Sequence, residues 1–331
     1  MNLDLRNKLV LVSGASGLIG TCLIKLLLAE GAKVRALVRN PSKTKYLRNP
    51  GIEIKVIDFA DPATFKNTVQ DCQIVFHFAG VLNEFKPYAY YQQVNVAGTK
   101  ALAEMAIEKG VERFIHTSTV WVYGLQSAGL IDETSPRVKS GNFYTDSKVE
   151  GEETIHHLVK YKNLPAIIVL PSQAYGPDDP SWTLRPLELI NSGRMILVDG
   201  GQGLIQPIYI DDLAAGILLA AKTGKVGQSY ILCGRQSISI REYFGLLANL
   251  AGKKRLPSIP EWLAIIMARC AEYWAGLAHS KPAFTRQEIQ ATLARAIYNG
   301  DKARTELGFV PKTDLTTGMA KIKQWLEAGN R

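Results

Sequence analysis

The sequence predicts an α/β fold: a doubly wound parallel sheet with helices on both faces, followed by a smaller C-terminal lobe. Three observations support this. Strand-like and helix-like segments alternate through the first 170 residues, the pattern of parallel strands joined by crossover helices. A glycine-rich turn joins the first of these strands to the first helix. Proline, aspartate and aromatic residues then crowd positions 171–186, where the chain leaves the sheet.

Six short apolar runs predict the strands of the first half. Each has the length of a buried strand and is bounded by turn-forming or polar residues. In chain order they cover residues 9–13, 33–38, 52–57, 74–78, 114–117 and 166–170.

Helical segments connect these strands, because apolar residues recur three and four positions apart. Gly31 and Gly110 each end a helix, since glycine adopts the backbone turn beyond a helix without strain. Asp61 followed by Pro62 predicts a short helical start. The expected helices cover residues 18–29, a segment opening at 61, 94–109 and 150–160.

The glycine-rich turn reads Gly14-x-x-Gly17-x-x-Gly20 and stands between a strand and a helix. Glycine there allows the tight turn, close approach of a pyrophosphate and close packing of helix on strand. The helix that begins at this turn offers free amides and a positive dipole end. A tight turn without a ligand is the alternative. The position of the turn in an alternating chain favours a dinucleotide-binding, Rossmann-type sheet.

In the second half, residues 205–210 and 229–232 have the pattern of strands returning to the sheet, and 257–277 that of a long apolar helix. Two units follow from this organisation. They are a dinucleotide-binding domain, residues 1–170 with 205–232, and a mainly substrate-binding lobe, residues 171–331.

The charge of the chain is +9, with a pI of about 9.2. A positive net charge of this size is typical of proteins that bind a nucleic acid, an acidic membrane surface or an anionic ligand. The basic residues are scattered, however, so we interpret most of them as a solvated face and expect no nucleic-acid partner. The densest basic cluster consists of Arg35, Arg39, Lys43, Lys45 and Arg48.

The four cysteines form neither a Cys-x-x-Cys pair nor a spacing typical of metal ligands, so we expect reduced thiols, no metal and a cytoplasmic location. The start of the chain lacks the apolar segment of a signal peptide. No apolar run has the length of a membrane span. The cysteines are Cys22, Cys72, Cys233 and Cys270.

The end of the second predicted strand indicates which dinucleotide is bound. A carboxylate at this place would accept hydrogen bonds from the adenosine ribose. Residues 33–41 contain no carboxylate, and Arg39 follows the strand. Arg39, helped by Lys43 or Lys45, can pair with a 2′-phosphate. We therefore expect NADP as cofactor, with NAD as the alternative; a merely solvated Arg39 is the competing interpretation.

Tyr144 and Lys148 are spaced so that both side chains lie on one helical face. A free tyrosine, with a pKa of about 10, holds its proton at neutral pH. A neighbouring ammonium and a positive nicotinamide ring would favour the phenolate, making Tyr144 a general acid and base. Lys148 can also hold the cofactor ribose. Most such pairs are surface neighbours, so the pattern needs a partner.

That partner is the run Thr117-Ser118-Thr119 at the carboxyl end of the fifth strand. A hydroxyl there points into the ligand crevice and can orient a substrate oxygen. The alternative is the strand preference of threonine followed by a turn. His116 precedes this run and alternates to the other side, so we interpret it as structural.

With these residues in place, the chain resembles the extended short-chain dehydrogenases/reductases, a group that includes nucleotide-sugar epimerases and dehydratases, 3β-hydroxysteroid dehydrogenases and dihydroflavonol reductases. Motifs along nearly the whole chain match in order. They are Gly14-x-x-Gly17-x-x-Gly20, Asp58-Phe59, Phe76-His77-Phe78-Ala79-Gly80, Asn95-Val96-Ala97-Gly98-Thr99, Thr117-Ser118-Thr119, Val122-Tyr123-Gly124, Tyr144-x-x-x-Lys148, Ala174-Tyr175-Gly176-Pro177, Ile210-Asp211-Asp212-Leu213, and Lys302-Ala303 before Glu306-Leu307-Gly308-Phe309.

The resemblance implies roles for individual residues. Thr119, Tyr144 and Lys148 take the catalytic positions. Asp58 would hold the adenine with Phe59 beside it, although Asp58 can also be a turn cap and Asn95 a helix cap. The full set of cofactor-binding residues expected from motif and resemblance is Gly14, Ser16, Gly17, Leu18, Ile19, Gly20, Arg39, Asp58, Phe59, Phe78, Ala79, Gly80, Asn95, Thr117, Tyr144, Lys148, Pro171 and Ser172.

Departures from the nucleotide-sugar pattern indicate the substrate. Arginine and asparagine are usual where this chain has Leu170 and Gln173, and arginine is frequent where it has Gln206. Val120 and Trp121 replace the Asp-Glu of dehydratases. We therefore expect an oxidoreductase that interconverts a secondary alcohol and a ketone on a bulky, largely apolar substrate. A sugar or nucleotide-sugar epimerase is the alternative, and a non-catalytic dinucleotide sensor is a third.

The apolar segment 257–277 allows three interpretations. It can wall an apolar pocket, lie on a membrane surface with the help of positive charge, or pack within the C-terminal lobe. We favour packing within the lobe. The expected partner is a small-molecule substrate, without stable membrane insertion, while peripheral membrane contact and a homodimer are left open.

Overall fold

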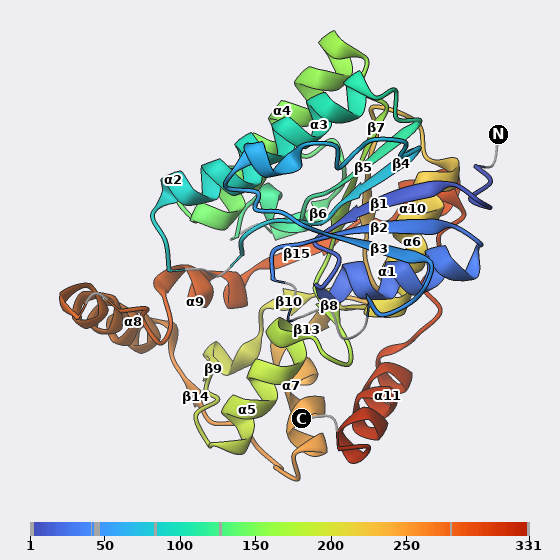
Figure 1. The fold of residues 1–331 in the computed structure, drawn as a ribbon. Helices are drawn as coiled ribbons and strands as arrows, with labels where there is room; N and C mark the ends of the chain where they lie inside the picture. Colours follow the sequence, from blue (N-terminus) through green and yellow to red (C-terminus); the bar gives the residue numbers. More distant parts are fainter. Residues whose placement is uncertain are drawn as a thin grey trace.

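The computed structural model describes residues 3–40, 42, 47–82, 85–125, 128–278 and 280–329. A seven-stranded parallel sheet lies at its centre, in the order β12-β7-β5-β4-β1-β2-β3 (Figure 1). The predicted α/β fold is confirmed. The strands are β1 (Leu9–Ser13), β2 (Lys33–Val38), β3 (Ile52–Val56), β4 (Ile74–His77), β5 (Arg113–Thr117), β7 (Ala166–Pro171) and β12 (Ser229–Leu232).

The chain reverses its winding direction between β1 and β4. Strands β2 and β3 follow on one side of β1, whereas β4, β5 and β7 are added on the other side. The crevice outside the carboxyl ends of β1 and β4 is therefore the place where ligands of such sheets bind. The glycine turn after β1 and residues 78–80 after β4 meet there.

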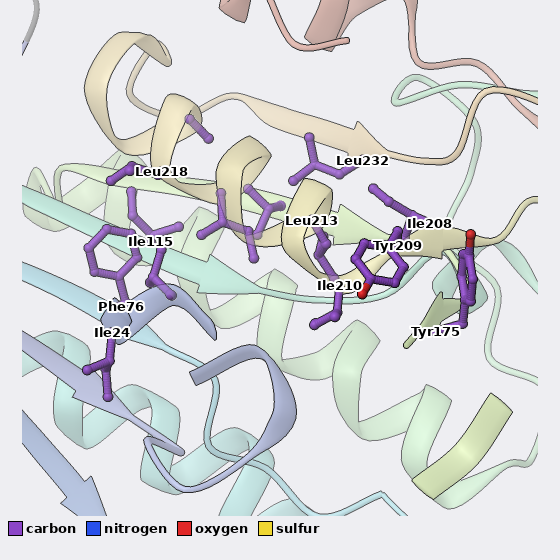
Figure 2. Packing of buried hydrophobic residues seen from close by; sticks show 14 of the residues in the cluster. Ile24, Phe76, Ile115, Tyr175, Ile208, Tyr209, Ile210, Leu213, Leu218 and Leu232 are labelled. Atoms are coloured by element: carbon purple, nitrogen blue, oxygen red, sulfur yellow. The ribbon is translucent and has the colours of Figure 1, made fainter. Parts of the chain in front are cut away.

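Helices cover both faces because side chains of each strand alternate between two apolar cores. Val10 and Val12 face the core beneath α1 and α6, whereas Leu11 faces the core beneath α3 and α4. Figure 2 shows the first core, with Leu213 of α6 on the same side as Ile115 of β5. These helices are α1 (Leu18–Ala29), α3 (Thr99–Glu108), α4 (Phe143–Lys162) and α6 (Ile210–Thr223).

The C-terminal lobe shares the first of these cores with the sheet. Phe244 of α7 and Leu187 of α5 belong to it, and Tyr175 packs edge-on against Tyr209 and Tyr243 at ring-centroid distances of 5.5 and 5.9 Å. The lobe elements are β8 (Ala174–Tyr175), a π-helical turn (Pro180–Leu184), α5 (Arg185–Asn191), β9 (Leu197–Val198), a 3₁₀ turn (Asp199–Gly201), β10 (Leu204–Ile205), β11 (Ile208–Tyr209), β13 (Ile238–Ser239), α7 (Ile240–Leu250), β14 (Ser258–Ile259), α8 (Glu261–Leu277), α9 (Arg286–Leu293), β15 (Arg295–Tyr298), α10 (Asp301–Leu307) and α11 (Leu315–Glu327).

The expectation that residues 205–210 return to the main sheet is wrong. Strand β10 pairs with β13 and β11 pairs with β8. Pro207 separates the two short strands and has no N–H to donate to a longer ladder. Ser229–Leu232 does rejoin the sheet, beside β7.

Two helices of the first half, those predicted over 94–109 and 150–160, begin earlier than the apolar spacing predicts. The chain turns helical at α2 (Tyr88–Tyr91) and passes through a π-helical turn (Gln92–Gly98) before α3. Three short elements complete this half: 3₁₀ turns at Pro62–Phe65 and Val120–Tyr123, and β6 (Ala128–Ile131), which pairs with β15. The π-helical turn matters for the site because it contains Asn95.

Arg35 of the basic cluster is buried rather than solvated. Its Nε donates to Glu53 Oε2 at 2.8 Å, and its Nη1 donates to the carbonyls of Thr68 and Gln70 at 2.9 and 2.6 Å. One guanidinium thus joins β2 to β3 and to the segment before β4.

Replacing Arg35 with methionine should lower the free energy of unfolding by about 1–3 kcal/mol, because buried carbonyl acceptors lose their donor. Arg304→Met is the matched control, since Arg304 pairs with Asp301 at 2.8 Å on the exposed surface; there the loss should be about 0–1 kcal/mol. Urea unfolding of both variants measures the difference, and equal losses would contradict the structural role of Arg35.

Candidate active site

The turn after β1 requires glycine at two positions. Gly14 has a φ of +64°, and a Cβ there would lie 2.9 Å from the backbone nitrogen of Ala79. A Cβ on Gly20 would lie 2.5 Å from the carbonyl oxygen of Gly14. Any side chain at either position would therefore push apart β1, α1 and the loop after β4.

The N-terminus of α1 forms a cradle at this turn. Gly17 is exposed and caps the helix with backbone alone, and the first helical turn contains no acidic residue. The first amides of a helix have no partner within it, and the positive end of its dipole lies there. Ser16, Leu18 and Ile19 are partly exposed around these amides. The cradle fits a pyrophosphate.

The loop after β4 is held beside the cradle by buried hydrogen bonds. The hydroxyl of Ser13 accepts from the amides of Phe78 and Ala79 at 3.1 and 3.2 Å and lies 2.7 Å from His77 Nδ1. The other ring nitrogen of His77 lies 2.8 Å from the hydroxyl of Thr99. Burial lowers the pKa of His77 to about 3, so its ring is neutral. This neutral chain fixes one wall of the crevice.

Asn95 braces the same loop. Its Oδ1 accepts from the amide of Val81 at 2.8 Å, and its Nδ2 donates to the Val81 carbonyl and to the Ser147 hydroxyl at 3.0 and 2.9 Å. A Cβ on Gly80 would lie 3.0 Å from Asn95 Oδ1. The amide is buried and joins this loop to α4 instead of capping a helix. Asn95 therefore positions the elements around the site.

Residues expected to meet the adenosine part are distributed beyond β2 and β3. Arg39 is exposed, and its Nη1 lies 3.4 Å from the hydroxyl of Tyr90. Asp58 Oδ1 accepts from the Ala60 amide at 2.9 Å, so its carboxylate also closes a turn. Phe59 is buried, and its ring stacks on His77 at a centroid distance of 5.2 Å. The expected helpers Lys43 and Lys45 lie outside the described residues.

Helix α4 carries the catalytic pair toward the end of β5. Asn142 begins the helix by accepting the Thr145 amide at 3.0 Å. Lys148, one turn after Tyr144, is buried, and its Nζ donates to the Thr117 carbonyl at 2.5 Å. The Thr119 hydroxyl lies near enough to the Tyr144 phenol to lower the pKa of that phenol. The structure thus brings together the three side chains that the sequence pattern selected.

Burial determines the protonation of this pair. It raises the pKa of Tyr144 to about 12, against the nearby Thr119 hydroxyl, which lowers it. Burial also lowers the pKa of Lys148 to about 8, opposed by the carboxylate of Glu152. The expectation of a lowered Tyr144 pKa is therefore wrong for the protein alone, because loss of solvent around the phenolate outweighs the stabilising contacts. Tyr144 keeps its proton at neutral pH.

His116, Thr117 and Ser118, at the end of β5, are buried polar residues. Both ring nitrogens of His116 and the hydroxyls of Thr117 and Ser118 have no hydrogen-bond partner among the described residues. Burial keeps the pKa of His116 well below its usual value, so the ring is neutral. Within the same described ranges, no three His, Cys, Asp or Glu side chains are placed to hold a metal ion.

Sequence reasoning missed Glu152, which lies one further turn along α4. This buried carboxylate accepts from Arg137 Nε at 3.0 Å, and the Arg137 guanidinium lies 4.8 Å from the centre of the Tyr123 ring. Repetition of Tyr144, Lys148 and Glu152 at four-residue spacing was the available signal. A cavity of about 440 Å³ beside Arg137 and Glu152 has neither Tyr144 nor Lys148 in its wall, so it is separate from the catalytic cluster.

Buried side chains after β7 connect the sheet to the lobe. The Ser172 hydroxyl donates to the Gln206 carbonyl at 2.6 Å. Gln206 Nε2 donates to the Gly234 carbonyl at 3.0 Å, and its Oε1 accepts from the Tyr298 amide at 2.9 Å. Gln173 Oε1 accepts from the Gln206 amide at 3.1 Å. Pro171, which ends β7, pairs with Leu232. Gln173 and Gln206, which stand where nucleotide-sugar enzymes usually have asparagine and arginine, thus form hydrogen bonds with backbone groups.

Known proteins share this architecture over the full length of the chain. A ketoreductase of 4-hydroxy-2-methyl-3-oxo-4-farnesyl-3,4-dihydroquinoline-1-oxide from Stigmatella aurantiaca is 29% identical, over 96% of each chain. A putative dihydroflavonol 4-reductase from Synechocystis sp. is 30% identical, over 96% of this chain and 94% of its own. The crystal structure of gox2253 superposes with a TM-score of 0.81 at 30% identity, covering 98% of this chain and 99% of its own.

A family model described as the NAD dependent epimerase/dehydratase family matches residues 10–233. This range contains the glycine cradle, the loop after β4, Thr119 and the α4 pair. The two sequence relatives named above are described as a ketoreductase and a putative reductase, and the family binds NAD(H). The chain is therefore an enzyme of the NAD-dependent epimerase/dehydratase family, within the extended short-chain dehydrogenases/reductases.

Proposed function

We propose that this enzyme interconverts a ketone and a secondary alcohol on a bulky, largely apolar substrate, with Tyr144 as proton donor and acceptor. The observation that carries the proposal is the placement of the Thr119 and Tyr144 side chains near each other at the end of β5, beside the buried ammonium of Lys148. When bound, the nicotinamide cofactor exchanges the hydride with the carbonyl carbon.

In the direction of reduction, Tyr144 Oη donates its proton to the carbonyl oxygen. The raised pKa of about 12 keeps that proton in place until negative charge develops on the substrate oxygen. Thr119 donates a hydrogen bond to the same oxygen. The Lys148 ammonium then stabilises the phenolate left on Tyr144 and holds the cofactor ribose. Oxidation of the alcohol uses the same groups in reverse.

Two observations support an apolar substrate. Trp121 lies edge-on to Tyr144 at a ring-centroid distance of 6.4 Å, so an aromatic surface borders the proton donor. Gln173 and Gln206 bind backbone groups between sheet and lobe. The similarity to a ketoreductase named for a farnesyl-bearing compound points the same way.

An epimerase is the second candidate, because the family description includes epimerases. The same three side chains would then oxidise a sugar carbon transiently and reduce it again on the other face. Retention of the cofactor without net redox change would identify that activity.

We also propose NADP as the preferred cofactor. Arg39 stands exposed directly after β2, beside the hydroxyl of Tyr90. A guanidinium pairs well with a 2′-phosphate. The carboxylate usual at this place for NAD is missing from residues 33–40.

Tyr144→Phe should lower kcat for ketone reduction by about 10²- to 10⁴-fold, because the proton donor is lost. Cofactor affinity should fall far less than kcat, because Lys148 still holds the ribose. A panel of steroid, flavonoid and sugar substrates, followed at the nicotinamide absorbance, gives the rates. Tyr161→Phe, which alters an exposed tyrosine on the same helix, is the control. Full turnover by Tyr144→Phe would disprove this mechanism.

Arg39→Ala should weaken NADPH binding by about 10- to 100-fold, the value of a hydrogen bond to a charged group. NADH binding should change little, because NADH lacks the 2′-phosphate. Fluorescence titration with both cofactors measures the ratio. An equal loss of affinity for NADPH and NADH would show that Arg39 does not bind the 2′-phosphate.

Affinity for NADPH should fall as the pH rises through about 8, because Lys148 then loses its charge. The sign follows from burial, which lowers the pKa of this ammonium from 10.5 to about 8. Lys148 therefore loses its charge at a lower pH than an exposed lysine does. Lys148→Met should bind NADPH weakly at every pH without this transition. A transition that persists in Lys148→Met would assign the effect to another group.

A further inference from the structure

Helix α8 has its amphipathic pattern inverted. The residues it buries are small: Ala264, Ala268 and Ala275. Large apolar side chains lie on its exposed surface, with Trp262 63% and Trp274 66% accessible. The preference for packing within the lobe is therefore wrong for most of the bulky side chains of this helix. In Figure 1, α8 stands out at the edge of the molecule, beyond α9.

The exposed apolar side chains share one side of α8. At about 100° per residue, the three buried alanines fall within a narrow arc of about 40°. Trp262, Ile266, Tyr273 and Leu277 fall opposite this arc, and Met267 and Trp274 lie on one flank, about 80–100° from it. We call this surface the α8 face, and it contains no charged side chain. Its members are Trp262, Ile266, Met267, Tyr273, Trp274 and Leu277.

Exposed basic residues precede helix α8 in the chain, and one borders the α8 face. Lys253, Lys254 and Arg255 are exposed just before the helix, and Arg269 is exposed at the border of the face. Of the two acidic residues on α8, Glu272 pairs with Arg286 at 2.8 Å. Two copies of this chain joined through their α8 faces would bring like charges together, whereas an anionic lipid surface complements them.

The buried side of α8, opposite the α8 face, is connected to the catalytic helix by a short chain of contacts. Ala264 and Ala268 pack against Ile289 of α9. From the same helix α9, Gln287 Oε1 accepts from Asn142 Nδ2 at 3.0 Å. Asn142 is the residue that begins α4, two positions before Tyr144. A surface that binds α8 would therefore lie near the start of the catalytic helix.

We propose that the α8 face docks on an anionic membrane surface, with its Trp and Tyr side chains at the depth of the lipid headgroups. Within the described residues, no helix is both long and apolar enough to cross a bilayer, so α8 would lie in the plane of the interface. Resting on the proposed function, this docking presents the site to ketones dissolved in lipid. Apolar burial supplies most of the binding energy, and the exposed lysines and arginines near α8 add attraction.

Flotation of the full chain with vesicles tests this docking in the absence of substrate. The protein should bind phosphatidylcholine vesicles that contain phosphatidylglycerol, bind pure phosphatidylcholine far less, and detach partly at high salt. Trp262→Glu/Trp274→Glu should weaken partitioning by about 10- to 100-fold. Lys253→Glu/Lys254→Glu should weaken it about fivefold for each charge removed. Tyr161→Glu, at an exposed tyrosine of α4, is the matched control and should bind normally.

Fluorescence identifies the inserted side chains. Brominated lipids should quench the wild-type tryptophan emission, and Trp262→Phe/Trp274→Phe should lose that quenching while still floating with vesicles. Turnover of a water-soluble ketone without vesicles should be unchanged in all these variants, which also reports on folding. Failure of the proposed reductase activity would leave vesicle binding intact, so the two proposals fail separately.

Loss of vesicle binding in the wild-type protein would overturn the docking proposal in either of two forms. One is an oligomer that dissociates on dilution and is abolished by Trp262→Glu/Trp274→Glu, with no vesicle binding; the α8 face would then bind a second copy. The other is absence of both vesicle binding and self-association. Equal binding by Trp262→Glu/Trp274→Glu and wild type would equally exclude the α8 face as the contact.

Discussion

The geometry of the site depends on one buried contact, the ammonium of Lys148 against the Thr117 carbonyl. A buried charge is costly unless it is hydrogen-bonded, and the carboxylate of Glu152, one turn along α4, offsets part of this cost. The contact holds α4 against the end of β5. Tyr144 is thereby placed where Thr119 reaches it. The same burial that anchors the helix keeps the phenol protonated and lowers the pKa of the ammonium to about 8. Anchoring and proton transfer therefore depend on the same burial.

Most polar side chains around the crevice bind other parts of the protein. Asn95 holds the loop after β4, and Gln206 holds strand β15 of the lobe through the Tyr298 amide. The Ser13 hydroxyl holds the backbone of Phe78. A buried polar group needs a hydrogen-bond partner, and for these three side chains the protein itself supplies it. The catalytic cluster is therefore set in a rigid frame, with the aromatic ring of Trp121 at its border.

The two parts of the chain form one packed unit. The core beneath α1 and α6 continues into the lobe through Tyr175 and Tyr243, so the lobe is fixed against the carboxyl ends of the strands. Helix α8 is the exception, since it attaches through alanines and turns its bulky residues outward. Exposed apolar patches of this size are typical of surfaces that bind a partner or a membrane, as we propose for the α8 face.

The sequence by itself determined the order and kind of the main elements and selected Thr119, Tyr144 and Lys148, because apolar periodicity and glycine turns are local properties of the chain. Four segments, Leu9–Ser13, Leu18–Ala29, Lys33–Val38 and Ser229–Leu232, match their predicted bounds. Only the tertiary structure decided which neighbours each side chain meets. In the folded chain Arg35 is buried, Gln206 forms hydrogen bonds with backbone groups, and the α8 face is exposed. The tertiary structure also decided the protonation of Tyr144, because a pKa depends on how much solvent and charge the folded chain leaves around the group.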